Sequence, residues 1–149
     1  MVWGAISRSG GLHLICMEGK ITADAYIDML ENDFFKMVDE DLPENLIWMH
    51  DNAPPHVAAK TKAYLERNRI VTMEWLPMSP DLNPIENIWS LMAKEVYKEE
   101  KVYKNTTDLW DAVVAAWLAI LLETFQNLYN SMTSRMIKVI EEKGEQIRF

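Results

Sequence analysis

The stretch LIWMHDNAPPH, residues 46–56, joins an apolar run to a polar end that is closed by two prolines. Leu46–His50 has the composition of a buried strand, and Pro54 and Pro55 prevent that strand from continuing and stiffen its exit. Asp51 therefore follows the carboxyl end of a predicted strand directly. Because α/β sheets bind ligands at the carboxyl ends of their strands, we expect the chemistry of this chain to begin here.

Patterning on either side of this stretch predicts strands and crossovers first, and helices later. Four of the five glycines lie in the first nineteen residues, and all six prolines lie between positions 43 and 84. The expected elements are a hairpin of Val2–Ser7 and Leu12–Met17, a helix from Thr22 or Asp24 to about Asp39, the strand Leu46–His50, a helix Val57–Asn68, a strand Ile70–Trp75, a loop Ser79–Asn83, and helices from Pro84 to about Glu99, from a Thr107 cap through Leu122, and from about Glu123 to Lys143. Strands that alternate with helices predict an α/β fold that contains parallel strands.

Composition bounds the class of protein. The length of 149 residues fits one domain, and a hydrophobic content of 49% supports a buried core. A single cysteine excludes a disulfide framework, and the longest apolar run, Ala112–Leu122, is too short to span a bilayer. We therefore expect a soluble intracellular protein with no membrane partner. The net charge of −8 argues against a free-standing nucleic-acid binder, because phosphate contacts need Lys and Arg.

Two acids are the candidate metal ligands, and each has a purely structural alternative. Asp51 can bind a hard cation through oxygen, or it can form an Asx-turn with the backbone near Ala53. Glu86 falls at the third position of a helix whose cap is Asn83, so it can equally close a capping box. Thirty-four residues lie between the two acids, and both are expected at the same edge of the sheet. Such a pair suits a magnesium site for phosphoryl transfer.

The remaining polar residues give weaker indications. His50 can orient a nucleotide or a water molecule, or it can be a packed residue at the end of its strand. His56 can be no more than a polar residue of a first helical turn, and three scattered histidines do not make a zinc site. Lys94 and Lys98 follow Glu86 along one helix and are the best candidates for contacts with a DNA backbone. Solvated helix faces explain them as well.

Two motifs at this spacing resemble the catalytic domain of Tc/mariner-superfamily transposases, in particular the nematode-type branch. They are HDNAPPH (His50–His56) and LPMSPDLNPIENIWSLMAKEV (Leu76–Val96). Other stretches that agree are VWGAIS (Val2–Ser7), GKITADAYIDML (Gly19–Leu30), Ser131-Met132 with Arg135 and Met136, and Lys143-Gly144 followed by the terminal Phe149. The resemblance extends over essentially the whole chain.

The resemblance implies an RNase H-like (retroviral integrase-type) fold, with a mixed sheet flanked by helices and a site of two Asp and one Glu. Asp51 matches the second acid and Glu86 the third, which leaves Asp81 to the loop, while His50, Asn52 and Asn83 are supporting residues inside the motifs. Two Mg²⁺ or Mn²⁺ ions held by the triad would activate water and then a DNA 3′-hydroxyl. The implied partners are transposon-end and target DNA and a second copy of the chain, and the implied location is the nucleus.

The resemblance also implies what is absent. The family's first Asp lies on a central strand upstream of the VWG motif, preceded by a helix-turn-helix DNA-binding region, and neither has a counterpart here. We therefore expect residues 1–149 to form a single, partial catalytic domain with a helical C-terminal part, to be less stable than a longer chain, and to be inactive alone. The alternatives are a non-catalytic interaction or dimerisation module that uses the apolar Ala112–Leu122 segment, and a nuclease that receives its first acid from a partner.

Overall fold

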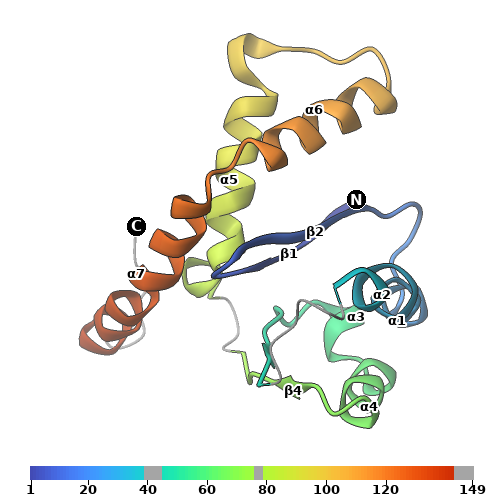
Figure 1. Cartoon of the computed structure of the whole chain (residues 1–149). Helices are drawn as coiled ribbons and strands as arrows, with labels where there is room; N and C mark the ends of the chain where they lie inside the picture. The colour runs from blue at the N-terminus through green and yellow to red at the C-terminus, as the bar shows by residue number, and fades with distance from the viewer. Residues whose placement is uncertain (39–44, 76–78, 143–149) are drawn as a thin grey trace. The chain divides into compact units, whose positions relative to one another are not determined.

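The computed structural model describes residues 1–38, 45–75 and 79–142 (Figure 1). Contacts divide the chain into two compact units. The first unit contains Met1 and residues 17–78, and the second contains Val2–Cys16 and residues 79–149. Asp51 therefore belongs to the first unit and Glu86 to the second. The expected ends at Asp39 and Lys143 and the stretch 76–78 lie outside the described residues.

The first unit consists of short helices and a two-stranded parallel sheet. Its elements are α1 (Ala23–Met29), the π-helical η1 (Leu30–Phe34), α2 (Phe35–Val38), β3 (Ile47–Trp48), α3 (Pro54–Val57), α4 (Ala59–Arg67) and β4 (Val71–Thr72). Helix α1 packs against both α3 and α4. The alternation of strand and helix, and the parallel pairing, are as predicted.

Helix α1 begins at Ala23, and its N-cap is Thr22, one of the two residues predicted to start it. The Thr22 hydroxyl accepts a hydrogen bond from the Ala25 N–H, as an N-cap residue does. The helical spacing of the apolar residues predicts a core face of Tyr26, Met29, Leu30, Phe34 and Met37, and the first four of these side chains are buried. The prediction for Met37 is wrong, because its side chain is 67% exposed. The π-helical turn η1 widens the helix and changes the rotation of every later residue about the axis.

The parallel strands are much shorter than the predicted segments Leu46–His50 and Ile70–Trp75. Ile47 pairs with Val71 and Trp48 with Thr72, and one further bond joins the Met73 N–H to the Trp48 carbonyl at 2.8 Å. A strand extends only as far as its partner offers ladder hydrogen bonds, and β3 and β4 overlap over this short stretch. Trp48 is buried as expected, with its ring edge-on to Phe34 at a centroid distance of 5.3 Å.

The helix expected over Val57–Asn68 begins earlier and is interrupted. Helix α3 starts at Pro54, a residue whose fixed φ suits a first helical turn, and Ala58 breaks the helix with ψ of 142°. The Thr61 hydroxyl donates to the Pro55 carbonyl at 2.6 Å and so ties α4 to α3. The spacing of Val57, Thr61, Tyr64 and Leu65 predicts one buried face; the last three are buried on α4, whereas Val57, at the end of α3, is exposed.

The second unit packs three helices against an antiparallel hairpin. Strands β1 (Val2–Ser7) and β2 (Gly10–Cys16) form the hairpin, with a register shift between Ala5 and Ile6. The other elements are the 3₁₀ turn η3 (Pro80–Leu82), α5 (Pro84–Val96), the 3₁₀ turn η4 (Lys98–Glu100), α6 (Thr106–Leu118) and α7 (Leu122–Glu141). Strand β1 lies against α5, and β2 lies against α6 and α7 (Figure 1).

Two tryptophans pack directly on glycines of the hairpin. A Cβ atom on Gly4 would lie 2.7 Å from the Trp89 ring, and one on Gly11 would lie 2.5 Å from the Trp117 ring. Both distances are shorter than a carbon–carbon contact allows, so these positions exclude larger side chains. The core beneath them is formed by Ile88, Met92, Val96, Ala116, Trp117 and Phe125.

Three predicted helix boundaries in this unit are wrong for local reasons. Helix α5 ends at Val96 instead of Glu99, because Glu99 and Glu100 adopt positive φ angles near 57°. The cap of α6 is Asn105 and not Thr107, since the Asn105 side chain accepts from the Asp108 N–H at 2.8 Å. The apolar segment Ala112–Leu122 crosses the turn between α6 and α7 instead of lying in one helix.

The described strands form one antiparallel and one parallel pair, with no pairing recorded between the two sheets. Among helices in the described ranges, none combines the length and the apolar character needed to cross a bilayer.

Candidate functional site

Asp51 lies just after β3 and is held by two hydrogen bonds to the same carboxylate oxygen. Its Oδ1 accepts from the Ala53 N–H at 2.9 Å, which confirms the Asx-turn alternative. The same Oδ1 lies 2.7 Å from Nδ1 of His56, on the first turn that follows the two prolines. The Asp51 side chain is 53% exposed, and its Oδ2 has no hydrogen bond to any described residue. Asp51 thus combines a local structural role with one oxygen open to solvent.

The His56 ring is enclosed by two other rings. The His50 ring stacks on it with centroids 4.9 Å apart and planes 5° apart, and the Tyr26 ring contacts it at 4.4 Å. The Tyr26 hydroxyl lies 3.4 Å from His50 Nδ1. Burial, and secondarily the neighbouring His56 and Lys62, lower the pKa of His50 to about 4, while Asp51 opposes this shift. His50 is therefore a neutral ring at physiological pH, which is the form that stacks without charge repulsion.

Asn52 connects the ends of the two parallel strands. Its Nδ2 donates to the Trp75 carbonyl at 3.0 Å, across the stretch where the β3–β4 ladder has already ended. The residue beside Asp51 is therefore fixed to the neighbouring strand segment through its side chain.

Glu86 is the third residue of α5, and its side chain is exposed. Asn83 caps this helix by accepting from the Ile85 N–H at 3.4 Å, and Pro84 occupies the first helical position, as predicted. The positive end of the helix dipole lies at this turn and favours a carboxylate there. Glu86 thus has the position expected of a capping residue and is also accessible from solvent.

Arg135 braces the turn that carries Glu86, and this role was not predicted. Its side chain is almost fully buried, and Nη1 donates to the Asp81 carbonyl and to the Asn87 side-chain oxygen, both at 2.9 Å. Its Nε donates to the Ser131 hydroxyl at 3.0 Å, one turn earlier on α7. The sequence offered Ser131 and Arg135 at helical spacing, but nothing that identified their partners in η3 and α5.

The lysines considered for DNA contacts are both exposed. Lys94 lies in the last turn of α5, and Lys98 lies in η4, with its Nζ 3.8 Å from Glu95 Oε2. Charges at such exposed positions are available to a polyanion, and they are equally compatible with a solvated surface.

Two residues of the Asp51 cluster were not anticipated in these roles. The sequence indicated His56 only as a first-turn residue, and it indicated Tyr26 only as part of a helical core face. The available signal was the five-residue step from Asp51 to His56 across Pro54 and Pro55, which folds the ring back onto the carboxylate. Tyr26 comes from a distant helix, so its contact depends on tertiary packing.

The Asp51 environment fits a divalent cation only in part. Its free oxygen is the type of ligand that Mg²⁺ and Mn²⁺ prefer. The residues described contain no group of three or more His, Cys, Asp or Glu side chains that would hold a metal ion. Asp51 can thus contribute one ligand oxygen, and further ligands have to come from outside its immediate cluster.

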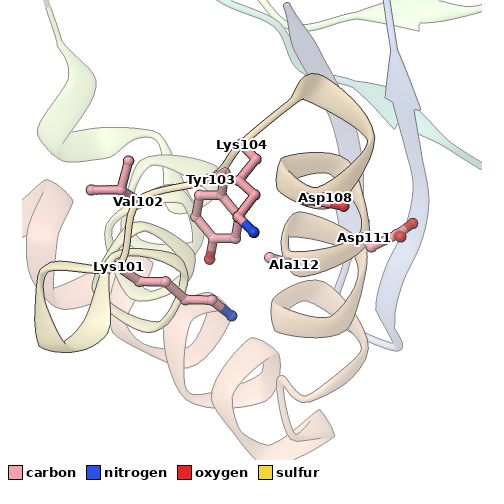
Figure 2. Close-up of a pocket in the computed structure, with 7 residues that line it drawn as sticks. All are labelled: Lys101, Val102, Tyr103, Lys104, Asp108, Asp111 and Ala112. Atoms are coloured by element: carbon pink, nitrogen blue, oxygen red, sulfur yellow. The ribbon is translucent and has the colours of Figure 1, made fainter.

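A pocket of about 430 Å³ lies beyond the C-terminal end of α5 (Figure 2). It is lined by Lys101, Val102, Tyr103, Lys104, Asp108, Asp111 and Ala112. Lys101 Nζ lies 5.1 Å from the centroid of the Tyr103 ring. None of the candidate site residues contributes to this pocket, which opens after the end of α5 whereas Glu86 lies in its first turn.

The sequence profile described as "DDE superfamily endonuclease" matches residues 1–109. The chain is 31% identical to the transposable element Tc3 transposase of Caenorhabditis elegans, over 100% of this chain and 45% of that protein. It is also 31% identical to the Tcb1 transposase of Caenorhabditis briggsae, over 97% of this chain and 52% of that protein. The chain thus spans about half the length of these curated relatives.

Solved structures agree in fold. The Mos1 transposase catalytic domain solved with raltegravir and Mg superposes with a TM-score of 0.87, at 19% identity, covering 99% of this chain and 76% of that chain. The Mos1 mariner paired end complex with Mn gives a TM-score of 0.88, at 19% identity, over 99% of this chain and 44% of that chain. These matches confirm the expected RNase H-like α/β fold.

Proposed function

The chain belongs to the DDE superfamily endonuclease family, and from this membership we propose that it is the catalytic segment of a DNA transposase. In the whole protein this segment serves metal-dependent phosphodiester cleavage and DNA strand transfer. The observation that carries the proposal is Asp51, which stands at the end of a parallel strand with one carboxylate oxygen restrained and the other open. The 149 residues supply two of the three acids of the family pattern, so we propose that they do not cleave DNA alone.

Asp51 and Glu86 are the proposed metal ligands, matching the second and third acids of the family. Both side chains are exposed, and both are carboxylates, the ligands that Mg²⁺ and Mn²⁺ favour. Relatives of this fold have been solved with Mg and with Mn, which supports a divalent cation. When bound, such ions lower the pKa of an attacking water or hydroxyl and neutralise charge at the phosphate.

The protein's own residues keep these ligands in place. Ala53 and His56 restrain Oδ1 of Asp51, and Asn52 fixes the adjoining backbone to the strand beside it. Asn83 and Arg135 fix the first turn of α5, from which Glu86 projects. His50 supports the Asp51 cluster through its stacked ring and not through a charge.

DNA, a second copy of the chain and the nucleus complete the proposal. Transposon ends and target DNA are the proposed substrates, supported by the paired end complexes described for the Mos1 transposase. Lys94 and Lys98 are the proposed contacts to the phosphate backbone, because both are exposed on and just after α5. We also propose a homodimer and a nuclear location, where chromosomal DNA is found.

The test measures Mn²⁺ binding to the chain, with electron paramagnetic resonance detecting the free ion. Asp51→Asn and Glu86→Gln should each weaken binding about tenfold or more, because each removes a charged oxygen ligand. Asp33→Asn and Glu95→Gln are matched controls, since both are exposed helix acids and should leave binding unchanged. Equal affinities for all four variants and the unaltered chain would refute the proposed site.

A second candidate function is an interaction or dimerisation module. Leu118, Leu121 and Leu122 are all at least half exposed around the turn from α6 to α7, whereas Ala116 and Trp117 are buried. Exposed leucines in one short segment favour a partner surface. Light-scattering mass of the chain and of Leu118→Glu tests this surface: a dimer that the substitution dissociates supports it, and a monomer in both cases opposes it. Because the transposase proposal also includes a homodimer, the Mn²⁺ titration is the measurement that separates the two functions.

A further inference from the structure

The segment from Asp51 to His56 is a closed loop fixed by its own hydrogen bonds. The Asp51 side chain accepts from the Ala53 N–H, and the Ala53 carbonyl accepts from the N–H groups of His56 and Val57 at 2.8 and 3.2 Å. Pro54 and Pro55 stand between them and limit the backbone freedom of the loop. The position of the His56 ring relative to Asp51 is therefore set by the loop itself.

Two further rings restrict the direction in which the His56 ring can turn. The ring lies 4.4 Å from Tyr26 and 4.9 Å from His50, measured between centroids, and its side chain is only 18% exposed. Tyr26 is itself almost completely buried on α1. A ring held on two sides in this way has little room to change rotamer, so its Nδ1 stays directed at Asp51.

The direction of the hydrogen bond follows from the chemistry of the two groups. An ionised carboxylate can only accept, so His56 Nδ1 must carry the proton and donate it to Asp51 Oδ1. Oδ1 receives two hydrogen bonds and Oδ2 receives none from the residues described.

We propose that His56 is a positioning residue that fixes the Asp51 carboxylate with Oδ1 restrained and Oδ2 presented to a divalent cation, with Tyr26 and His50 holding the His56 ring in place. The inference rests on the proposed function of Asp51 as a metal ligand. Nδ1 of His56 is engaged by Asp51 and is therefore not a ligand of the ion, so the role proposed for His56 is to orient Asp51. Loss of a partner that orients a metal ligand typically weakens metal affinity 10–100-fold.

The experiment compares two substitutions in the full chain. His56→Asn keeps a donor N–H near the position of Nδ1, whereas His56→Phe keeps the ring between Tyr26 and His50 but removes the donor. Mn²⁺ affinity should fall about tenfold or more in His56→Phe and stay within about threefold of the unaltered chain in His56→Asn. His13→Phe, in the hairpin, is the matched control and should bind Mn²⁺ as the unaltered chain does.

A second readout needs no variant of His56. Long-range ¹H–¹⁵N NMR of the unaltered chain should show the His56 ring protonated on Nδ1, and Asp51→Asn should change that signal. An Nε2–H tautomer in the unaltered chain would overturn the inference. If His56→Phe does not unfold cooperatively, the NMR signal of the unaltered chain and the Mn²⁺ affinity of His56→Asn test the positioning role.

The outcomes separate this inference from the function on which it rests. No Mn²⁺ binding by the unaltered chain would refute the metal site and with it the role of His56. Binding that Asp51→Asn weakens but His56→Phe does not would overturn the positioning role alone. Weakening by both, with recovery in His56→Asn, is the expected result.

Discussion

Arg135 donates from Nη1 to the side-chain oxygen of Asn87 at 2.9 Å, which ties α7 to the first turn of α5. The same nitrogen also donates to the Asp81 carbonyl, so one buried guanidinium connects helix α7, turn η3 and helix α5. Asn87 directly follows Glu86. The orientation of a proposed ligand thus depends on an arginine that lies 48 residues away from Asn87 in the sequence.

Replacing Arg135 by Met should lower the free energy of unfolding by about 2–4 kcal/mol. The substitution removes three donated hydrogen bonds and leaves the Asp81 carbonyl and the Asn87 side chain without this donor. Arg8→Met is the control, because Arg8 is exposed and makes one hydrogen bond of 3.3 Å, and its effect should stay within about 0.5 kcal/mol. Urea unfolding measures both; a loss below about 1 kcal/mol for Arg135→Met would contradict the bracing role.

Replacing Asn83 by Ala should destabilise the chain by about 1 kcal/mol through loss of the α5 cap. The Asn83 side chain is buried and accepts from the Ile85 N–H at 3.4 Å, and an alanine side chain offers no oxygen for this bond. Asn83→Asp keeps the acceptor and should recover part of the loss. Thermal melting followed by circular dichroism is the measurement, and equal melting temperatures for Asn83→Ala and the unaltered chain would count against this role.

Acid should destabilise the chain through His50. Its pKa is about 4 in the folded state against an ordinary value of 6.5, so between these values the unfolded chain binds a proton that the folded chain does not. The free energy of unfolding therefore falls as the pH is lowered from about 6.5 to about 4, by about 1–2 kcal/mol once solvent screening of this partly exposed ring is allowed for.

His50→Gln should remove this part of the pH dependence. Urea unfolding at pH 7.5, 6, 5 and 4.5 gives the slope for each protein. His13→Gln is the matched loss of a histidine and keeps His50, so its slope should equal that of the unaltered chain. An unchanged slope in His50→Gln would show that His50 does not contribute.

Replacing Gly11 by Ala should cost about 1–3 kcal/mol, because the new methyl group would meet the Trp117 ring at 2.5 Å. Trp117→Phe removes the ring atoms that the methyl group meets. The destabilisation of the double variant should therefore be about 1 kcal/mol smaller than the sum of the destabilisations of the two single variants. A double-mutant cycle measured by urea unfolding tests this, and strictly additive effects would contradict the close approach.

Much of the fold could be predicted because its signals are local. The hairpin turn at Gly10, the Thr22 cap and the Asn83–Pro84 helix start each depend on residues within a few positions of one another. The helix boundaries that were predicted wrongly in the second unit depend on local details of backbone angle and capping that the pattern does not specify. The short overlap of β3 and β4, by contrast, depends on pairing with a segment distant in the sequence.

The candidate site also contains features that the sequence predicts and features that it does not predict. Strand ends, caps and spacing predict that Asp51 follows a strand and can form an Asx-turn, and that Glu86 is the third residue of its helix, and these local features are confirmed. The role of His56 could not be predicted, since it requires the rings of Tyr26 and His50 to meet it from two sides. Arg135 was missed for a similar reason, because its partners lie on η3 and α5.

Because the chain is synthesised from its N-terminus, the packing of the second unit is completed after a delay that does not affect the first unit. Residues 17–78 of the first unit are continuous, so their packing partners emerge from the ribosome together. The hairpin of the second unit is synthesised well before α7, because Tyr129 of α7, which donates to the Ile6 carbonyl at 3.0 Å, follows 123 residues later. At ribosomal rates of about 5–20 residues per second, the hairpin waits several seconds with its core face uncovered, the interval in which a chaperone or misfolding would act on it.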